Sequence, residues 1–432
     1  MTDHRVFAQP VKRRTFLAGS AAAAAALSMG IGKSWAQSGE KIKFWDMVWG
    51  TGQTYTDAAK GITDRYVPAG DLLGVEYQSI PWSSWYQTFT AAGAANSTPA
   101  VSSGAAYLPF YFMDQGKMAP ADDLVARLDK EGKNDFLPGL IDALRTKDGL
   151  AAVPWSIDLR VLWYRKSILE KVGADVPTDW QSYIKTGEAL QKAGHVGFGT
   201  SGYGFHGIAS VLLNNGGGLF NEDGEPDCVT DRNIESLDFL HELVAKQIID
   251  PYAIGYDYVA NVVPDWQNGH IAMGFEQVGM PGKMPADVAA DLVVCSPITS
   301  VSGSKGAAYW INPLMMFKTT ASQESSEAFL SYYLDNLHLY WENNLNSDLP
   351  VKKSITDLPI FQNDPNLAKA VNEWQPVGKT IAARSKFPFA ALNAVDGGSA
   401  MINMLQRVLQ GESNSKELLA ELQAGLIKVM HP

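Results

Sequence analysis

The chain has 432 residues, a formal net charge of -11 and 46% hydrophobic residues. Beyond its first 36 residues the chain has no cluster of Lys and Arg, and such an acidic chain is poorly suited to holding nucleic acid or an anionic membrane surface. Its length exceeds what one ordinary hydrophobic core needs and is sufficient for two lobes.

The first 36 residues predict an export signal. Lys12-Arg13-Arg14-Thr15-Phe16-Leu17 is a twin-arginine motif, an uncharged run follows from Ala18 to Ile31, and Ser34-Trp35-Ala36 is a small-x-small cleavage site. The apolar run is shorter than the roughly 18–20 residues that span a bilayer. No Cys stands at the cleavage site. We therefore expect a soluble periplasmic protein, exported by the twin-arginine machinery without a lipid anchor, that begins near Gln37.

The spacing of apolar residues predicts strands and helices in turn along the chain. Expected strands cover 41–45, 74–80, 196–199 and 292–295, with an extended crossing segment at 149–164. Expected helices cover about 54–66, 84–95, 182–192, 208–214, 326–339, 396–409 and 415–429. Thr178 is the expected N-cap of the helix at 182–192, because Gln181 stands at the capping-box spacing. This alternation predicts an α/β architecture of parallel sheets covered by helices.

Cysteine and histidine usage argues against a metal cofactor. Two cysteines, Cys228 and Cys295, are too few to hold an iron–sulfur cluster. The seven histidines include no H-E-x-x-H pattern. The two cysteines could form one disulfide in an oxidising compartment, but two separate buried thiols are favoured, because the lobes proposed below separate them.

Two overlapping G-x-G-x-x-G patterns lie within 197–207. A dinucleotide-binding turn needs small residues so that the backbone can approach the pyrophosphate. Tyr203, Phe205 and His206 crowd the second pattern, so a loop that presents Tyr203 and His206 to a cleft is favoured. No P-loop and no G-x-S-x-G motif is present, and no pair of carboxylates is singled out as catalytic.

The segment Val153–Lys166 places charged residues inside an apolar strand. Asp158 and Arg160 cost free energy there unless both are paired. One interpretation is an internal ion pair that stabilises a crossing between lobes. The other is a sugar site, in which Asp158 accepts hydrogen bonds from hydroxyl groups, Arg160 donates to them and Trp155 offers a flat apolar face.

The same segment carries a family resemblance. The pattern V-P-x-x-x-D-x-R-x-L-x-Y-x-K, followed by Ile168–Gly173 and Pro177–Trp180, is similar to family 1 extracellular solute-binding proteins, the maltose-binding-protein-like receptors of ABC importers. Further similar pieces follow in order: Leu212–Phe220, Trp266–Met273, Leu349–Lys353 and Val408–Gly411. Two pieces depart from the pattern. Pro99-Ala100 stands where Pro-Asp is usual, and Gly274-Phe275-Glu276 where Gly-x-Trp is usual.

The resemblance implies a two-lobed periplasmic-binding-protein fold, each lobe a mostly parallel sheet flanked by helices and joined by a hinge. We expect the N-terminal lobe at 40–155 and 293–340, and the C-terminal lobe at 156–292 and 341–432. The implied function is capture of a carbohydrate between closing lobes and delivery to the permease subunits of an ABC importer, by a monomer without enzymatic activity. A receptor of the same fold for a polyamine or peptide and a secreted carbohydrate-active enzyme remain alternatives.

The resemblance and the residue chemistry together nominate the site. The candidates lie at strand ends and loops expected to face the cleft, where aromatic faces supply burial and polar groups set orientation. They are Trp45, Asp46, Trp49, Trp82, Trp155, Asp158, Arg160, Tyr203, His206, Glu276, Trp310, Asn312, Arg384 and Phe387. Trp163 and Trp180 are expected in the core.

Overall fold

The computed structural model describes residues 40–50, 52–198, 205–250, 252–253, 258–412 and 414–431, and the predicted export signal lies outside these ranges. No helix in the described ranges combines the length and the apolarity that crossing a membrane requires. Residues 40–432 cluster as one unit by their internal contacts.

Eleven strands build most of the framework in the described ranges. They are β1 (Lys41–Met47), β2 (Gly74–Ile80), β3 (Val101–Ser103), β4 (Arg145–Thr146), β5 (Gly149–Leu150), β6 (Val153–Arg165), β7 (Met273–Gln277), β8 (Leu292–Val294), β9 (Ala307–Met316), β10 (Leu349–Pro350) and β11 (Gly378–Lys379). The main sheet has the order β10-β6-β9-β3-β1-β2, with β7 and β8 paired to β6 and β11 paired to β9.

Helices cover these strands. They are α1 (Gly52–Asp64), α2 (Trp85–Ala94), α3 (Leu108–Asp114), α4 (Asp122–Lys130), α5 (Lys166–Val172), α6 (Trp180–Lys192), α7 (Phe205–Asn214), α8 (Asp231–Ala245), α9 (Val263–Asn268), α10 (Ala286–Asp291), α11 (Gln323–Asp335), α12 (His338–Glu342), α13 (Lys353–Thr356), α14 (Pro359–Gln362), α15 (Pro365–Lys369), α16 (Leu392–Asp396), α17 (Ala400–Leu409) and α18 (Ser415–Met430). Shorter turns include η1 (Asp142–Leu144), η3 (Tyr258–Val262), η4 (Met280–Lys283), η5 (Ala370–Trp374) and η6 (Gln375–Val377).

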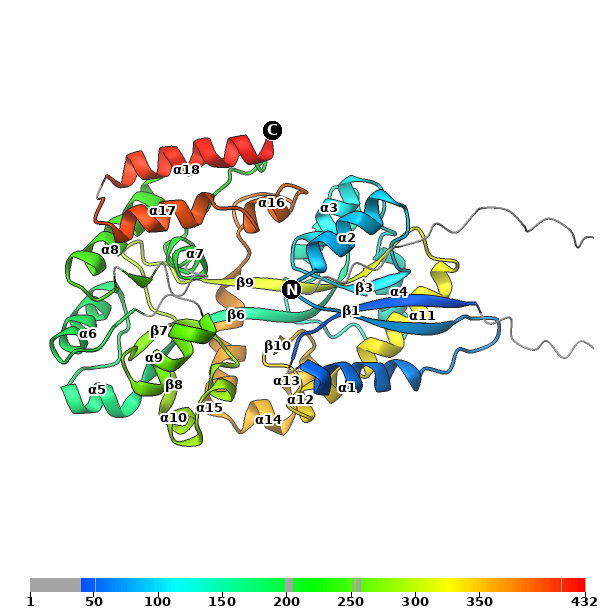
Figure 1. Cartoon of the computed structure of the whole chain (residues 1–432), viewed down its shortest axis with the longest axis horizontal. Helices are drawn as coiled ribbons and strands as arrows, with labels where there is room; N and C mark the ends of the chain where they lie inside the picture. The colour runs from blue at the N-terminus through cyan, green and yellow to red at the C-terminus, as the bar shows by residue number, and fades with distance from the viewer. Residues whose placement is uncertain are drawn as a thin grey trace, which may run out of the picture. The chain divides into compact units, whose positions relative to one another are not determined.

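Two long strands connect the two halves of residues 40–432. β6 and β9 lie side by side in antiparallel register, with Asp158 opposite Trp310 and Ser156 opposite Asn312. In Figure 1 they run between a group that contains β1, β2, α1 and α11 and a group that contains α5, α6, α8 and β7. This arrangement confirms the α/β, two-lobed fold class. The domain boundaries expected from the sequence stay a prediction.

The pairing pattern differs from the expected mostly parallel sheets. β1 pairs in parallel with β2 and with β3, as strand–helix alternation predicts. Every pairing of β6, with β7, β8, β9 and β10, is antiparallel. The reason is that β6 and β9 cross between the two halves in opposite directions, so the sheet through the middle is mixed.

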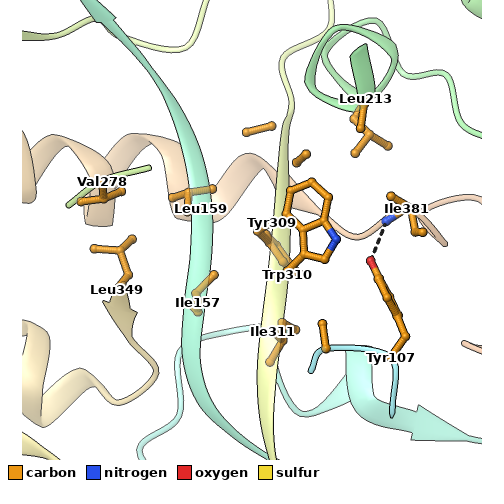
Figure 2. Close-up of a cluster of buried hydrophobic side chains, with 14 of the residues drawn as sticks. Tyr107, Ile157, Leu159, Leu213, Val278, Tyr309, Trp310, Ile311, Leu349 and Ile381 are labelled. Carbon is orange, nitrogen blue, oxygen red and sulfur yellow. Dashed lines mark hydrogen bonds between the residues drawn. The ribbon is translucent and has the colours of Figure 1, made fainter. Parts of the chain in front are cut away.

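The apolar face of these crossing strands is a buried cluster. Ile157 lies opposite Ile311, and Leu159 opposite Tyr309. Figure 2 shows these four side chains along the two strands, with the Tyr107 hydroxyl and the backbone of Ile381 joined by a hydrogen bond beyond β9. Burial of such side chains contributes about 1.5–3 kcal/mol each. The crossing is therefore a hydrophobic core as well as a connection.

Most expected elements are present, and four differ in detail. The segment expected as a strand at 196–199 forms only an isolated bridge from Val196 to Ile271, because the backbone amides of Gly197 and Phe198 both donate to the carbonyl of Ile248. Gly199 lies outside the described residues. The helix expected at 326–339 is divided into α11 and α12, and the helix expected at 396–409 begins at Ala400, after Gly397-Gly398.

The fourth difference is the cap of α6. Asp179, not Thr178, is the N-cap: its carboxylate accepts a hydrogen bond from the Ser182 amide, and the Ser182 hydroxyl accepts one from the Asp179 amide. The capping box is therefore real but lies one residue later than expected. Asp is at least as good an N-cap as Thr, and its negative charge also favours a helix N-terminus.

Cys228 and Cys295 are both buried and unbridged, as favoured from the sequence. The Cys228 thiol donates to the Leu219 carbonyl, and the Cys295 thiol donates to the Pro177 carbonyl. Burial raises the pKa of both thiols to about 12, so both are held as uncharged thiols.

Asp179→Ala should lower the free energy of unfolding by about 1 kcal/mol, because the Asp179 carboxylate no longer accepts hydrogen bonds from the Ser182 amide and hydroxyl. Urea denaturation of the wild-type and Asp179→Ala chains at pH 7 measures the difference. Thr178→Ala is the control and should change stability less, since its hydroxyl makes only a 3.5 Å contact with the Asp179 carboxylate. A larger loss in Thr178→Ala would contradict the assigned cap.

Candidate functional site

A cavity of about 620 Å³ lies beside the polar face of β6 and β9. Its walls combine large aromatic side chains with amide and charged side chains. The aromatic members are Trp49, Trp82, Trp163, Trp341 and Phe361, and the polar members are Asp158, Gln277, Lys283, Asn312, Asn344, Asn346, Ser347, Asp348, Asp364 and Asn366. Its volume is typical of small-molecule sites, which span about 300–1,000 Å³.

Strand ends and turns from distant parts of the sequence meet at this cavity. Trp49 follows β1 and Trp82 follows β2, and the carboxyl ends of these parallel strands lie at one edge of the sheet. Gln277 ends β7 and Lys283 ends the turn η4. Open α/β sheets bind ligands outside the carboxyl ends of their strands for this geometric reason.

The indole rings at the cavity are held in a fixed arrangement. Trp49 is stacked on Trp155 with ring centroids 5.3 Å apart, and it meets Trp82 edge-on at 5.1 Å. Trp155 is fully buried and lies behind Trp49, against Tyr340 and Trp341. Such contacts stabilise beyond the area they bury. The cavity therefore has a rigid aromatic wall.

Asp46 helps to orient Trp49 in this wall. It is completely buried, where its carboxylate accepts hydrogen bonds from the Ser103 hydroxyl at 2.6 Å and the Tyr55 hydroxyl at 3.0 Å. The Ser103 oxygen in turn accepts from the Trp49 indole N–H at 3.0 Å and from the Met47 amide at 2.8 Å. Asp46 therefore orients Ser103, and Ser103 orients Trp49.

Charged groups on β6 form a linked network at the cavity floor. The Arg160 guanidinium donates to the Asp158 carboxylate at 2.8 Å and lies 4.0 Å from the Glu276 carboxylate. The Gln277 amide donates to Asp158 at 3.4 Å and accepts from the Lys283 ammonium at 2.7 Å. Two cations and several carboxylates thus share one partly buried region, where ion pairs interact more strongly than in water.

A second part of the network joins β6 and β9 to the turn before β10. The Asn312 amide donates to the Ser156 hydroxyl and to the Asp348 carboxylate, each at 3.0 Å. The Ser156 hydroxyl also donates to Asp348, at 3.1 Å. The Asp348 amide donates to the Asn346 side-chain oxygen at 2.9 Å. These bonds fix the turn that carries Asn346 against the crossing strands.

Burial shifts the pKa of several of these carboxyls. Loss of hydration raises the pKa of Glu276 to about 7, although the Arg160 charge opposes the shift. Loss of hydration also raises the pKa of Asp348 to about 7, with a further contribution from the Asp158 carboxylate. Desolvation lowers the pKa of the Lys283 ammonium in the same region.

Two polar atoms at the cavity have no hydrogen-bond partner among the residues that the structure describes. They are the Oδ1 atom of Asp158, an acceptor, and the Nδ2 atom of Asn346, a donor. Both side chains line the cavity. Unpaired buried polar groups cost about 1–3 kcal/mol each. Ligand hydroxyl groups can both donate to an acceptor such as Asp158 Oδ1 and accept from a donor such as Asn346 Nδ2.

The structure brings four of the predicted site residues to the cavity wall. These are Trp49, Trp82, Asp158 and Asn312. Behind the wall, Trp155 contacts Trp49 and Arg160 contacts Asp158. Asp46 acts on Trp49 through Ser103, and Glu276 lies 4.0 Å from Arg160. The sequence therefore predicted the β1 end, the β2 end and the β6 strand as parts of one location.

Other predicted residues lie away from the cavity. Trp45 packs in the core against Phe89. Trp310 donates its indole N–H to the Asp396 carboxylate at 2.8 Å and meets the His206 ring edge-on at 4.4 Å. The Arg160 guanidinium lies 5.9 Å from the centroid of the Trp310 ring, so Trp310 and His206 adjoin the charged network without lining the cavity. Tyr203 lies outside the described residues.

The last two predicted residues lie near another surface depression. Arg384 forms an ion pair with Asp227 and donates to the Asp227 carbonyl at 3.0 Å, which holds the loop at 218–227. Phe387 is exposed and lines a cavity of about 410 Å³ with Phe110 and Phe389. Trp163 and Trp180 are buried, as expected, although Trp163 also borders the main cavity.

Sequence reasoning missed the contribution of two turns. Asn344, Asn346 and Asp348 come from a polar run after α12, directly before the Leu349–Lys353 segment that carried part of the resemblance. That run of amides beside a family motif was the available signal. Lys283 in η4 had no comparable signal, because no pattern marks a lone lysine in a Gly-Pro turn.

No group of three or more His, Cys, Asp or Glu that could hold a metal occurs within the described ranges. The cavity holds no arrangement for covalent chemistry that the geometry singles out. What it offers is a rigid aromatic wall, paired charges and unsatisfied hydrogen-bonding atoms on a two-lobed frame. The fold and the site thus define a binding protein for a small solute.

Comparison with known proteins identifies the group. Residues 73–336 match the bacterial extracellular solute-binding protein family, and the chain belongs to it. It is therefore a solute-binding receptor rather than an enzyme.

Three similar proteins illustrate the match. A sugar transporter of Arthrobacter chlorophenolicus A6, crystallised with bound laminaribiose, is 41% identical with a TM-score of 0.80, over 91% of this chain and all of that one (100%). The sugar-binding protein MalE of Xanthomonas citri is 19% identical, with a TM-score of 0.77 over 90% of this chain and 97% of that one, and shares the fold. An arabinooligosaccharide-binding protein of Halalkalibacterium halodurans is 22% identical over 249 residues, 54% of this chain and 56% of the relative.

The buried carboxyl of Asp46 should make stability depend on pH. Burial raises its pKa to about 7, above the value of about 3.9 in an unfolded chain. Its contribution is therefore fully present below about pH 4 and is lost as the pH rises through 7. Asp46→Asn should give a shallower fall in melting temperature between pH 5 and pH 8 than the wild-type chain.

Melting temperatures of both chains at pH 5, 6, 7 and 8 measure this effect. Because His206 and the other titrating groups are common to both chains, their contributions cancel in the difference. Asp57→Asn, at an exposed position of α1, is the matched control and should follow the wild-type curve. Parallel curves for Asp46→Asn and wild type would contradict the assignment.

Proposed function

We propose that this protein captures a carbohydrate at the cavity beside β6 and β9 and delivers it to an ABC importer. The observation that carries the proposal is the pair of unpartnered atoms, Asp158 Oδ1 and Asn346 Nδ2, at a cavity walled by Trp49 and Trp82. Sugar hydroxyls both donate and accept hydrogen bonds, and pyranose C–H groups pack on indole faces. A sugar can therefore bond to the unpartnered polar atoms and pack against the indole rings at the same time.

The relatives support this solute class. The Arthrobacter protein was crystallised with laminaribiose, and the Halalkalibacterium protein is described as binding arabinooligosaccharide. The Asp158 carboxylate already pairs with Arg160 and is linked through Gln277 to Lys283, so a polyamine would have to compete with two resident cations for this carboxylate.

The proposal extends to how the protein works. We place the two lobes at 40–155 with 293–340 and at 156–292 with 341–432, and propose that they close over the sugar about β6 and β9. Hinge closure around a ligand is a known mode of motion in periplasmic binding proteins. The membrane permease subunits are the partner for the closed form, and the receptor acts as a monomer.

We further propose that residues 1–36 direct export by the twin-arginine route and are then removed. The Lys12-Arg13-Arg14 motif and the small-x-small site at Ser34–Ala36 support this proposal. A chain that matures near Gln37 without a Cys at the cleavage site leaves a periplasmic receptor with no lipid anchor.

A thermal-shift panel of mono-, di- and oligosaccharides, sugar acids, polyols, amino acids, peptides and polyamines tests the solute class. A ligand at about 100 times its dissociation constant stabilises a protein by about 2.7 kcal/mol, which is several degrees for a chain of this size. We expect shifts from carbohydrates only, with the sugar recovered unchanged. Shifts confined to amines or peptides would overturn the proposal.

Asp158→Asn and Trp49→Ala should each weaken binding of the best sugar by at least about tenfold, or about 1.4 kcal/mol. The first loses a charged acceptor, and the second loses the face on which the sugar packs. Isothermal titration calorimetry measures both affinities.

Asp291→Asn is the matched control for Asp158→Asn. Asp291 pairs with Arg165 at 2.7 Å at the other end of β6, at similar burial and away from the cavity. It should lower the melting temperature but leave the affinity unchanged. Equal losses of affinity in Asp158→Asn and Asp291→Asn would mean that the effect is one of folding, not of contact.

A further inference from the structure

The aromatic wall of the cavity continues outward onto the surface of α2. Trp82 meets Trp85 edge-on with ring centroids 6.3 Å apart, and Trp85 meets Tyr86 edge-on at 5.6 Å. Together with the contact between Trp49 and Trp82, these rings form a continuous row, which we call the aromatic row: Trp49, Trp82, Trp85 and Tyr86. It runs from a member of the cavity wall to a solvent-exposed position.

The outer members of the aromatic row are unusually exposed for such large side chains. Trp82 is 44% exposed and Tyr86 is 50% exposed. Trp85 is partly buried against the hydrophobic core, so its large side chain has a role in packing. The half-exposed Tyr86 contacts the Trp85 ring but does not belong to that core. Exposed aromatic patches of this kind mark binding surfaces more often than chance.

The ring of Trp82 is also held in place. Its indole N–H donates to the Val48 carbonyl at 2.8 Å, although the side chain is largely exposed. This bond and the edge contact with Trp49 orient the ring before any ligand arrives. A preoriented ring loses little conformational freedom on binding, which favours affinity.

The neighbours of the aromatic row favour a polar, uncharged ligand. The residues next to the row in sequence are Ser83, Ser84, Gln87, Thr88 and Thr90, and α2 itself carries no charged residue. An anionic membrane surface would need Lys or Arg at this place. Hydroxyl and amide groups beside flat apolar faces suit a chain of sugar rings, and Trp82 makes this surface continuous with the cavity.

We propose that the aromatic row is a second binding surface, on which an oligosaccharide extends out of the cavity along Trp82, Trp85 and Tyr86. The proposal rests on the carbohydrate function proposed above and deepens it. The solute is then an oligosaccharide of three or more units, bound at one end inside the cavity and at the other end on α2. The inner units contact Asp158 and Trp49, and the outer units contact exposed rings.

Calorimetric titration of the mature protein with laminari-oligosaccharides and arabino-oligosaccharides of two to five units tests this inference. In the wild-type chain the affinity should rise about tenfold or more from the disaccharide to the longer members of the series that binds. Tyr86→Ala should abolish the larger part of this gain while leaving the affinity for the disaccharide within twofold. Tyr86→Phe should retain the gain, because the ring remains.

Tyr252→Ala removes an exposed tyrosine elsewhere on the chain and is the matched control. It should bind every length as the wild-type protein does. Equal affinity for all lengths in the wild-type chain, or an equal loss at all lengths in Tyr86→Ala, overturns the second surface and leaves the carbohydrate function standing. Absence of binding by either series overturns the second surface as well, and the thermal-shift panel then shows whether the carbohydrate function survives.

Discussion

The antiparallel pairing of β6 with β9 is the constraint on which the rest of this structure depends. It joins residues 153–165 to residues 307–316 and makes one sheet of strands that are otherwise distant in the sequence. Because side chains alternate along a strand, the pairing sorts them into two faces. Ile157 and Leu159 enter a core (Figure 2), whereas Ser156, Asp158 and Asn312 face the polar side. A slip of one residue would exchange the two faces.

The polar face is stable because its charged side chains are paired with one another. An isolated carboxylate at the position of Asp158 would be costly to bury, and Arg160 on the same strand offsets that cost. The two interpretations of this pair that the sequence left open are both compatible with the structure. Arg160 pairs with one carboxylate oxygen of Asp158, while the other oxygen has no partner among the described residues. The same ion pair thus supports the crossing and leaves an acceptor at the cavity.

The aromatic wall shows how a core can supply a binding surface. Asp46, Ser103 and Trp155 are buried and contact no ligand space directly, yet they determine where the Trp49 ring lies. Positions next to the cavity in sequence therefore divide into those that line the cavity and those that orient the lining side chains. Sequence proximity cannot separate the two, because the position of Trp49 in the loop after β1 depends on its hydrogen bond to Ser103 at the end of β3.

The sequence by itself determined the class of fold, the strands and helices of 40–100 and the polar interruption at Asp158 and Arg160, because these features are local patterns of spacing and composition. Ordered family motifs also predicted the receptor function. The tertiary structure decided which candidates meet. It brought Trp49, Trp82 and Asp158 to one cavity, placed Trp45 in the core, and added Asn346, Asp348 and Lys283 from turns with no local signal. A site made of strand ends and turns depends on how distant segments pack, and no local pattern of residues encodes that packing.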